Sequence, residues 1–295
     1  MLHKNSIKAI LDTIEQQKKE KLAVEQLAAL AYMSGSHLQS LFKLLTGQPL
    51  MTYVRGRKLA HSLYELFNTN MRIIDIANEY GFAHEQSYIR AFQAEFDLPP
   101  SKARRQKIAL TIRERISADS LTETSGGLTF GPEHVIAPGF HIVGVPTRFR
   151  DFDVVRDGQK PNAVGREAYF NILSKLAAEP DVYYGLCRYL SENEVEYMSS
   201  VKVSNLNHVP VGLKGWSFPP FKYVKFRYVG KHPPEEITMV IAAETYKAVD
   251  HFFRNQSRYL FPGDYHYERI DTKKYDGVFC QMDLFFPIID RQEDI

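Results

Sequence analysis

The sequence predicts a multidomain chain of the α plus α/β kind. An all-α domain carrying two helix-turn-helix units is followed by an α+β domain of two βαββ repeats on a curved antiparallel sheet. Three observations lead to this fold. A pattern of helix, tight turn and second helix occurs twice within the first hundred residues. The apolar residues change from helical spacing to strand-like alternation after about residue 132. The length of 295 residues suffices for two domains.

The second copy of the helix-turn-helix pattern is the clearer one. Gly81 tolerates a left-handed backbone and ends one helix. The next helix, residues 85–96, carries Tyr88, Phe92 and Phe96 at spacings of four, so one face is fixed into a core. Glutamine pairs bidentately with adenine and arginine with guanine, so the opposite face is predicted to contact DNA bases. Its residues are His84, Glu85, Gln86, Ile89 and Arg90.

The first copy lies 49 to 50 residues upstream, where the apolar positions of the second copy recur. Its reading helix is predicted over residues 36–45, with an exposed face of Ser36, His37, Gln39, Ser40 and Lys43. Tyr32 stands where the second copy has Gly81. A left-handed tyrosine is strained by roughly 1–2 kcal/mol, so we expect this turn to be built differently. Two units joined by a long helix can read two successive major-groove segments without a dimer.

The charge of the chain is unevenly distributed. Residues 1–116 hold 17 Lys or Arg and 11 Asp or Glu, a net charge of +6, and the remainder has a net charge of −4. A basic first part fits contacts with DNA phosphates, although a solvated charged surface is the alternative. The candidates for phosphate contacts are Arg55, Arg57, Lys58, Lys102, Arg104 and Arg105, and among them we single out Arg57.

About residues 5–107 resemble the DNA-binding domain of the AraC/XylS family of bacterial transcription regulators. The residues that carry the resemblance include Leu27-Ala28, His37-Leu38-Gln39, Leu41-Phe42-Lys43, Gly47, Pro49, Ile76-Ala77, Tyr80-Gly81-Phe82, Gln86-Ser87-Tyr88, Arg90-Ala91-Phe92 and Pro100-Ser101. The resemblance implies sequence-specific binding to double-stranded DNA, transcription activation, contact with RNA polymerase and no enzymatic activity. The subgroup most similar to this chain acts as a monomer on DNA. Ser40 replaces an arginine that is usual in the family, so a base contact worth about 1–3 kcal/mol is expected to be missing there.

The composition then shifts and predicts a boundary. Residues 111–132 are polar and contain glycine, which is typical of a linker between a domain of residues 1–110 and a domain of residues 133–295. The first repeat is predicted as a strand at 141–145, a helix at 166–178 and strands at 182–190 and 195–203. The second is predicted as a strand at 223–229, a helix at 238–253 and strands at 265–270 and 278–288. We expect both helices on one side of the sheet and a cleft on the other.

Residues 134–290 resemble the GyrI-like small-molecule-binding domain, which occurs in multidrug-sensing regulators. The resembling residues include Tyr197, Val201, Tyr223, Gly230, Phe252, Tyr267-Glu268 and Asp283-Leu284-Phe285-Phe286-Pro287-Ile288. The resemblance implies an effector site with Glu268 at the centre of an aromatic cleft. The ligand-binding residues that we predict are Glu268, Tyr197, Trp216, Tyr223 and Phe285, and further aromatic candidates are Tyr183, Tyr184, Tyr189, Phe218 and Phe221.

A carboxylate on a half-buried strand costs several kcal/mol unless it is paired or solvated. A cationic or lipophilic effector would offset that cost, and aromatic walls would add cation–π attraction. A salt bridge with a neighbouring cation, or a position on the rim, is the alternative interpretation of Glu268. Trp216 is predicted in a loop between the two repeats.

Two other roles for the second domain stay open. Beside effector binding, the alternatives are a protein-interaction module with a vestigial cleft and a hydrolase in which Glu268 acts as general base with Tyr197. The sequence shows no nucleophile–base pair, phosphate-binding loop or metal-ligand spacing, so we predict neither a cofactor nor a metal. Cys187 and Cys280 are expected to be buried free thiols, which fits a reducing cytoplasm. Without a signal peptide or an apolar run near 18 residues, we expect a cytoplasmic protein that does not enter membranes.

Overall fold

The computed structural model describes residues 4–124, 126–150, 172–191, 194–237 and 239–291. The chain divides into a helical unit, Lys4–Asp119, and a sheet unit that begins at Ser120. A helical double helix-turn-helix region followed by a large antiparallel sheet is therefore confirmed. The division falls within residues 111–132, but Leu121–Glu123 and Gly127–Ala137 form strands β1 and β2 rather than linker. Leu121 and Leu128 are buried there, which the polar composition of the segment concealed.

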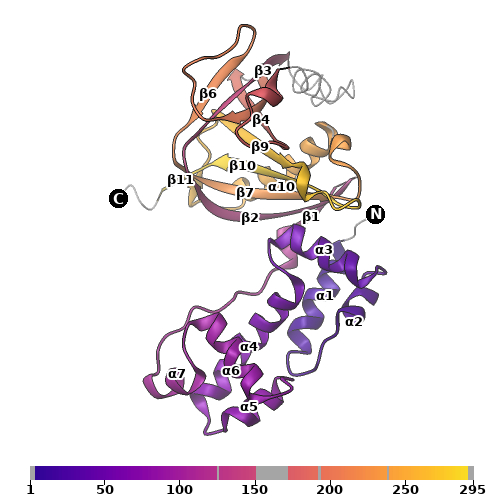
Figure 1. Cartoon of the computed structure of the whole chain (residues 1–295), viewed down its shortest axis with the longest axis vertical. Coiled ribbons are helices and arrows are strands. Elements are labelled where there is room, and N and C mark those ends of the chain that lie inside the picture. Colours follow the sequence, from indigo (N-terminus) through magenta and orange to yellow (C-terminus); the bar gives the residue numbers. More distant parts are fainter. Residues whose placement is uncertain (1–3, 125, 151–171, 192–193, 238, 292–295) are drawn as a thin grey trace. The chain divides into compact units, whose positions relative to one another are not determined.

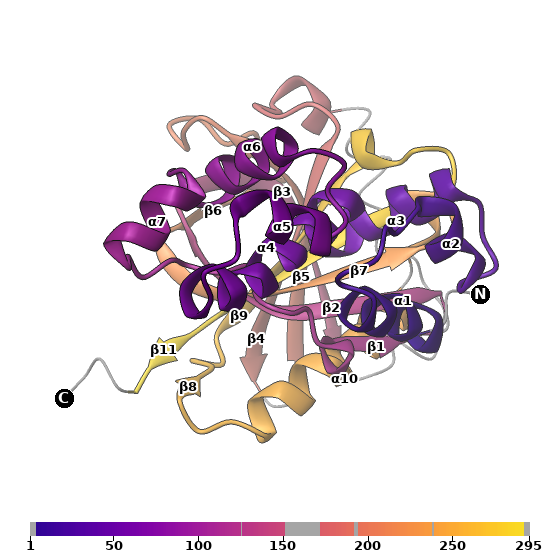
Figure 2. The ribbon, with the colours of Figure 1, turned by 90° about the horizontal axis from the view of Figure 1, so that it is seen from below.

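The helical unit is built around its longest helix, α4. Its helices are α1 (Lys4–Gln16), α2 (Val24–Ala29), α3 (Gly35–Thr46), α4 (Leu50–Asn68), α5 (Ile73–Glu79), α6 (Glu85–Phe96) and α7 (Pro100–Gln106). Helices α1 to α3 lie on one side of α4 and α5 to α7 on the other, as both views show (Figures 1 and 2). The helical spacing of the apolar residues decides this arrangement, because Tyr88, Phe92 and Phe96 of α6 are buried against Leu59 and Leu66 of α4.

The turn of the first helix-turn-helix unit keeps the standard shape despite its tyrosine. Tyr32 has φ 52° and Gly81 has φ 71°, both in the left-handed region. The amide of Met33 donates to the carbonyl of Ala28 at 3.2 Å, and the amide of Phe82 donates to that of Ala77 at 2.9 Å. The expectation of a different turn was therefore wrong. The side chain of Tyr32 is fully exposed, so the chain carries only the backbone strain.

The sheet unit contains one nine-stranded sheet in which every pair of neighbouring strands is antiparallel. The order is β1-β2-β7-β10-β9-β4-β5-β3-β6. Besides β1 and β2, its strands are β3 (Phe140–Arg150), β4 (Val182–Ser191), β5 (Glu194–Val203), β6 (Lys214–Phe218), β7 (Phe221–Gly230), β9 (Tyr265–Asp271) and β10 (Cys280–Pro287). Short strands β8 (Tyr259–Leu260) and β11 (Ile289–Asp290) pair separately.

The second predicted repeat has the expected βαββ order of β7, α10 (Met239–Arg254), β9 and β10. In the first repeat, β3, β5 and β4 lie side by side in the same spatial order as β7, β10 and β9. Of the predicted helix at 166–178, residues 166–171 lie outside the described residues. The described residues 172–178 contain only the 3-10 turn Leu173–Lys175, so a helix is not confirmed there. Strand β6 includes Trp216, which was predicted in a loop.

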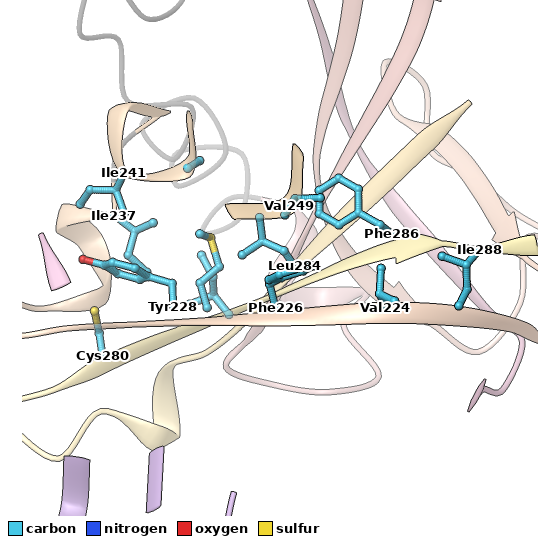
Figure 3. Close-up of a cluster of buried hydrophobic side chains, with 13 residues drawn as sticks. Val224, Phe226, Tyr228, Ile237, Ile241, Val249, Cys280, Leu284, Phe286 and Ile288 are labelled. Carbon is cyan, nitrogen blue, oxygen red and sulfur yellow. The ribbon is translucent and has the colours of Figure 1, made fainter. Parts of the chain in front are cut away.

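Helix α10 covers one face of the sheet, which we call the helix-covered face. Figure 3 shows its apolar side chains meeting those of β7 and β10. The buried residues of this cluster include Val224, Phe226, Tyr228, Ile241, Val249, Met282, Leu284 and Phe286. The opposite face has its own buried cluster, which includes Ile142, Tyr184, Leu186, Met198, Phe218, Tyr223 and Tyr267. That cluster draws on strands from both ends of the sheet, so the sheet curls around it, and we call this the concave face.

Candidate functional site

The first reading helix, α3, separates its buried and exposed residues as the sequence predicts. Leu38, Leu41, Phe42 and Leu45 are buried in the core. Ser36, Gln39 and Lys43 are exposed, and His37 and Ser40 are partly exposed. The hydroxyl of Ser34 accepts the amide of His37 at 3.3 Å and thereby caps the helix. The five predicted contact residues therefore reach the surface of one short helix.

The second reading helix, α6, has the same division. Tyr88 is buried, and its hydroxyl lies 2.9 Å from that of Ser62 on α4, which anchors the helix. Of the predicted contact residues, His84, Gln86 and Arg90 are exposed, and Glu85 and Ile89 are partly exposed. An arginine and a glutamine near the start of this helix are thus available for base edges.

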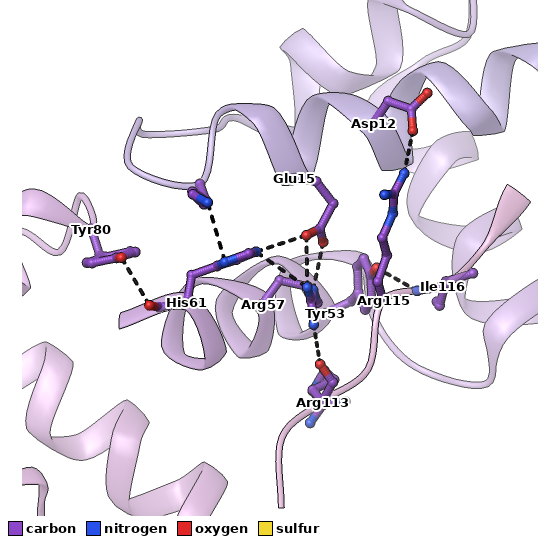
Figure 4. Close-up of polar contacts among 10 residues, drawn as sticks. Asp12, Glu15, Tyr53, Arg57, His61, Tyr80, Arg113, Arg115 and Ile116 are labelled. Carbon is purple, nitrogen blue, oxygen red and sulfur yellow. Dashed lines mark hydrogen bonds and ion pairs between the residues drawn. The ribbon is translucent and has the colours of Figure 1, made fainter. Parts of the chain in front are cut away.

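Arg57 does not fit the predicted role in phosphate binding. Its side chain is only 8% exposed, and its Nε and Nη2 donate to the two carboxylate oxygens of Glu15 at 2.6 and 2.8 Å. Figure 4 shows this bidentate pair between α1 and α4. Burial alone would raise the pKa of Glu15, but hydrogen bonds from Arg57 and His61 outweigh it and lower the pKa to about 2. Arg57 therefore joins two helices, and its assignment to DNA contact was wrong.

The other phosphate candidates divide in the same way. Lys58 is buried and donates to the backbone carbonyls of Glu20 and Tyr80, the latter at 3.1 Å. Arg104 is partly buried, and its Nε donates to the carbonyl of Leu66 at 2.9 Å. The candidates that remain exposed are Arg55, Lys102 and Arg105.

In the sheet unit, Glu268 is the centre of a buried polar network. Its side chain is on β9 and 4% exposed. Tyr197 donates to its Oε2 at 2.9 Å, and Tyr246 of α10 donates to its Oε1 at 2.7 Å. Burial raises the pKa of Glu268, and the two hydroxyls offset part of that rise. No lysine or arginine among the described residues forms an ion pair with Glu268, so the salt-bridge interpretation fails there.

The network continues to a buried histidine. His266 Nε2 lies 2.8 Å from the Tyr246 hydroxyl, and Nδ1 lies 3.0 Å from the Tyr189 hydroxyl. Burial lowers the pKa of His266 to about 3, so the ring is neutral near pH 7. Since Tyr246 donates to Glu268, it accepts from Nε2–H, and Nδ1 accepts from Tyr189. In this series of hydrogen bonds, every hydroxyl and ring proton is therefore donated in the direction of the Glu268 carboxylate.

The five predicted ligand residues lie on two faces rather than in one cleft. Side chains alternate along a strand, so Glu268 points away from its neighbours Tyr267 and Arg269. Glu268 and Tyr197 lie on the helix-covered face with Tyr246. Tyr223 and Phe285 lie on the concave face, where the Tyr267 and Phe285 rings stack at 4.5 Å. The expected cleft around Glu268 opposite the helices was therefore wrong.

Trp216 also belongs to the concave face. Its ring lies 6.2 Å from that of Tyr265, and the guanidinium of Arg188 covers it at 4.4 Å from the ring centre. Arg188 in turn donates to the buried Glu196 at 3.0 Å. The cation–π partner of Trp216 is thus an arginine of the chain itself.

Sequence reasoning missed Tyr246 and His266. The signal for His266 was its position two residues before Glu268, which places both side chains on one face of a strand. Tyr246 approaches from α10, 22 residues away, and no local pattern indicates that pairing.

The two cysteines of the chain are buried thiols. Burial raises the pKa of the Cys187 thiol well above its usual range, so it stays protonated near Glu268. Cys187 and Cys280 are both free and buried, as predicted. Within the described ranges, no group of three or more His, Cys, Asp or Glu side chains is arranged to hold a metal ion. None of the described helices is long and apolar enough to span a bilayer.

Comparison with known proteins gives sequence matches for the helical unit and structural matches for parts of the chain. A family model described as a helix-turn-helix domain matches residues 27–106. The multiple antibiotic resistance protein MarA of Escherichia coli (strain K12) is 37% identical over 99 residues, covering 34% of this chain and 78% of MarA. The HTH-type transcriptional activator AarP of Providencia stuartii is 35% identical over 95 residues, covering 32% of this chain and 70% of AarP. Among solved structures, an integron cassette protein from the mobile metagenome of Vibrio cholerae is 15% identical to this chain, with a TM-score of 0.41. The match covers 54% of this chain and 96% of the cassette protein.

Proposed function

Because the chain belongs to the AraC family of DNA-binding transcription regulators, rather than to a family of enzymes, we propose that α3 and α6 bind successive major-groove segments of one duplex. One observation carries the proposal. Both helices follow turns of the same backbone geometry, and each exposes polar side chains opposite its buried anchors. A single chain then holds both reading helices and binds as a monomer.

The expected consequence of DNA binding is activation of transcription through contact with RNA polymerase. The relative AarP is named a transcriptional activator, and we extend that activity to this chain. In vitro transcription from a template with a selected binding site, using purified RNA polymerase, tests the extension. More transcript in the presence of the protein supports activation, whereas less transcript would indicate repression.

Arg90 is the residue whose loss tests base reading most directly. Arg90→Ala is expected to cost about 1–3 kcal/mol of specific binding and to relax the preference at one base pair. Fluorescence anisotropy with a duplex selected from a random library measures the loss.

Lys102→Ala is the matched control, because this exposed lysine is a phosphate candidate. It is expected to weaken all sequences alike and to reduce the salt dependence of binding. Unchanged specific binding by Arg90→Ala would rule out the assignment of α6 as a base-reading helix.

For the sheet unit, we propose that the Glu268 network receives a lipophilic cation as effector. A carboxylate removed from water is costly without a counter-charge. Glu268 is held by two neutral hydroxyls, those of Tyr197 and Tyr246, and the hydroxyl of Tyr189 joins the network through His266, so three aromatic rings belong to the network. A bound cation would supply a counter-charge, which no described lysine or arginine provides, and would gain cation–π attraction from these rings. This effector would alter DNA binding or activation by the helical unit.

Two ions of equal shape and opposite charge test this site. Tetraphenylphosphonium and tetraphenylborate are titrated against the full chain by isothermal calorimetry. We expect saturable binding of the cation only, and Glu268→Gln should weaken it at least about tenfold, or 1.4 kcal/mol. Glu133→Gln, an exposed carboxylate of the same unit, is the control. Equal binding of both ions, or an unchanged Glu268→Gln variant, would reject Glu268 as the charge selector and favour a protein-binding role for the sheet unit.

A further inference from the structure

The segment after α7 crosses the helical unit instead of leaving it. We call residues 110–116 the strap. Leu110 packs against the core around α6. The backbone carbonyl of Arg113 accepts from Arg57 Nη1, and the amide of Ile116 donates to the Tyr53 hydroxyl at 3.0 Å (Figure 4). The strap is therefore tied to the second helix-turn-helix unit at its start and to α4 further along.

The side chain of Arg113 connects the ends of both reading helices. Its Nε and Nη2 donate to the two oxygens of Glu95, each at 2.9 Å, in the last turn of α6. Its Nη1 donates to the side-chain oxygen of Gln48, which follows the end of α3. One guanidinium thus bridges α6 to the residue beside α3. Planar bidentate pairing of this kind restricts angles as well as distances.

The central helix leaves room for this bridge. Gly56 lies inside the 19-residue helix α4, where glycine costs about 1 kcal/mol relative to alanine. A Cβ at this position would collide with Arg113, approaching its Cδ to 2.6 Å, and would come within 3.2 Å of Glu95 Oε1. A glycine that weakens the helix therefore accommodates the Arg113–Glu95 pair. The atoms in its way belong to a flexible side chain, so an alanine there displaces Arg113 without breaking the backbone.

We propose that Arg113 is a positioning residue that sets the relative orientation of α3 and α6 and thereby the spacing of the two half-sites that the protein accepts. The proposal rests on the proposed reading of DNA by both helices. Half-sites on one face of a duplex repeat about every 10 base pairs. A shift of one base pair changes both the distance and the rotation between the half-sites, so selectivity for spacing requires a rigid connection between the reading helices.

Selection of binding sites from a random duplex library tests the proposal, with the full chain and with variants. Arg113→Ala removes the bridge, and Gly56→Ala displaces it by another route. The pair Arg113→Glu with Glu95→Arg restores an ion pair of reversed polarity in the same place. Arg115→Ala is the matched control, because Arg115 belongs to the strap but forms its ion pair with Asp12 of α1, at 2.8 Å.

We expect wild type and Arg115→Ala to select a bipartite motif with one spacing. Arg113→Ala and Gly56→Ala should select the same half-site sequences with several spacings, and should bind the wild-type bipartite site about tenfold less tightly, because loose coupling lowers the effective concentration of the second helix. The reversed pair should restore the single spacing.

A general loss of stability would weaken binding without broadening the spacing. A single unchanged spacing in Arg113→Ala would overturn the positioning role while leaving the proposed function intact. A wild-type selection with only one half-site motif would overturn both.

Discussion

Glu15 of the helical unit and Glu268 of the sheet unit are both carboxylates held inside the protein, but their surroundings differ. Glu15 receives a guanidinium and an imidazole, and its pKa falls to about 2. Glu268 receives two tyrosine hydroxyls, and burial raises its pKa. The charge of Glu15 is neutralised by a partner within the chain itself, so this carboxylate contributes to the stability of the fold. The carboxylate of Glu268 has no ion-pair partner among the described residues, and such a group is a candidate for binding an external cation.

The largest expected effect comes from breaking the Glu15 pair. Arg57→Ala leaves Glu15 largely buried without its main cation and should destabilise the helical unit by about 3–5 kcal/mol. Urea unfolding followed by circular dichroism at 222 nm measures the change. Arg55→Ala, an exposed neighbour on the same helix, should stay within about 0.5 kcal/mol of wild type. If Arg57→Ala lowered the free energy of unfolding no more than Arg55→Ala does, the Arg57–Glu15 pair would contribute little to the stability of the fold.

This pair also shows what sequence patterns leave undetermined. The helical unit was predictable because apolar residues at helical spacing recur in both copies. The left-handed turn at Tyr32 was not predicted, because a tyrosine carries none of the conformational freedom that marks Gly81. The role of Arg57 was not predictable, because a basic residue in a helix looks the same whether it faces solvent or a carboxylate. Its partner Glu15 is 42 residues away, and only the folded arrangement of α1 and α4 brings them together.

In the sheet unit, removing the buried carboxylate should increase the free energy of unfolding, whereas breaking the Glu15 pair should decrease it. Glu268→Gln removes a carboxyl whose ionised form is costly when buried, so it should stabilise the sheet unit by about 1–3 kcal/mol at pH 8. The folded pKa of Glu268 is raised, so its stabilising effect is complete below the unfolded pKa and is lost as the pH rises through the folded pKa. The difference between variant and wild type should therefore vanish at about pH 4 and below.

Fluorescence of Trp216, the single tryptophan of the chain, reports unfolding of the sheet unit separately from the helical unit. A variant less stable than wild type at pH 8 would show that the two hydroxyls already compensate the charge of Glu268.

The location of this site was only partly predictable. The resemblance to a known domain led to Glu268 and Tyr197, and the structure joins those two residues by a hydrogen bond. It also led to Trp216, Tyr223 and Phe285, which lie on the other face. The alternation of side chains along β9 separates Glu268 from Tyr267, and that rule needs the strand register, which a list of aromatic residues does not contain. The short edge strands β1 and β6 were missed because pairing, more than composition, makes them strands.

The smallest expected effect comes from removing a single hydrogen bond of the Glu268 network. Tyr197→Phe removes one of the two hydroxyls that hold the carboxylate and should destabilise the sheet unit by about 1 kcal/mol at pH 8. At pH 4 the loss should shrink, because a protonated carboxyl depends less on a donated hydrogen bond. Tyr184→Phe is the control, since its hydroxyl donates to the partly exposed Glu179 at 3.1 Å. Equal losses from both variants at both pH values would indicate that Tyr197 contributes packing alone, and the carboxylate would then depend on Tyr246.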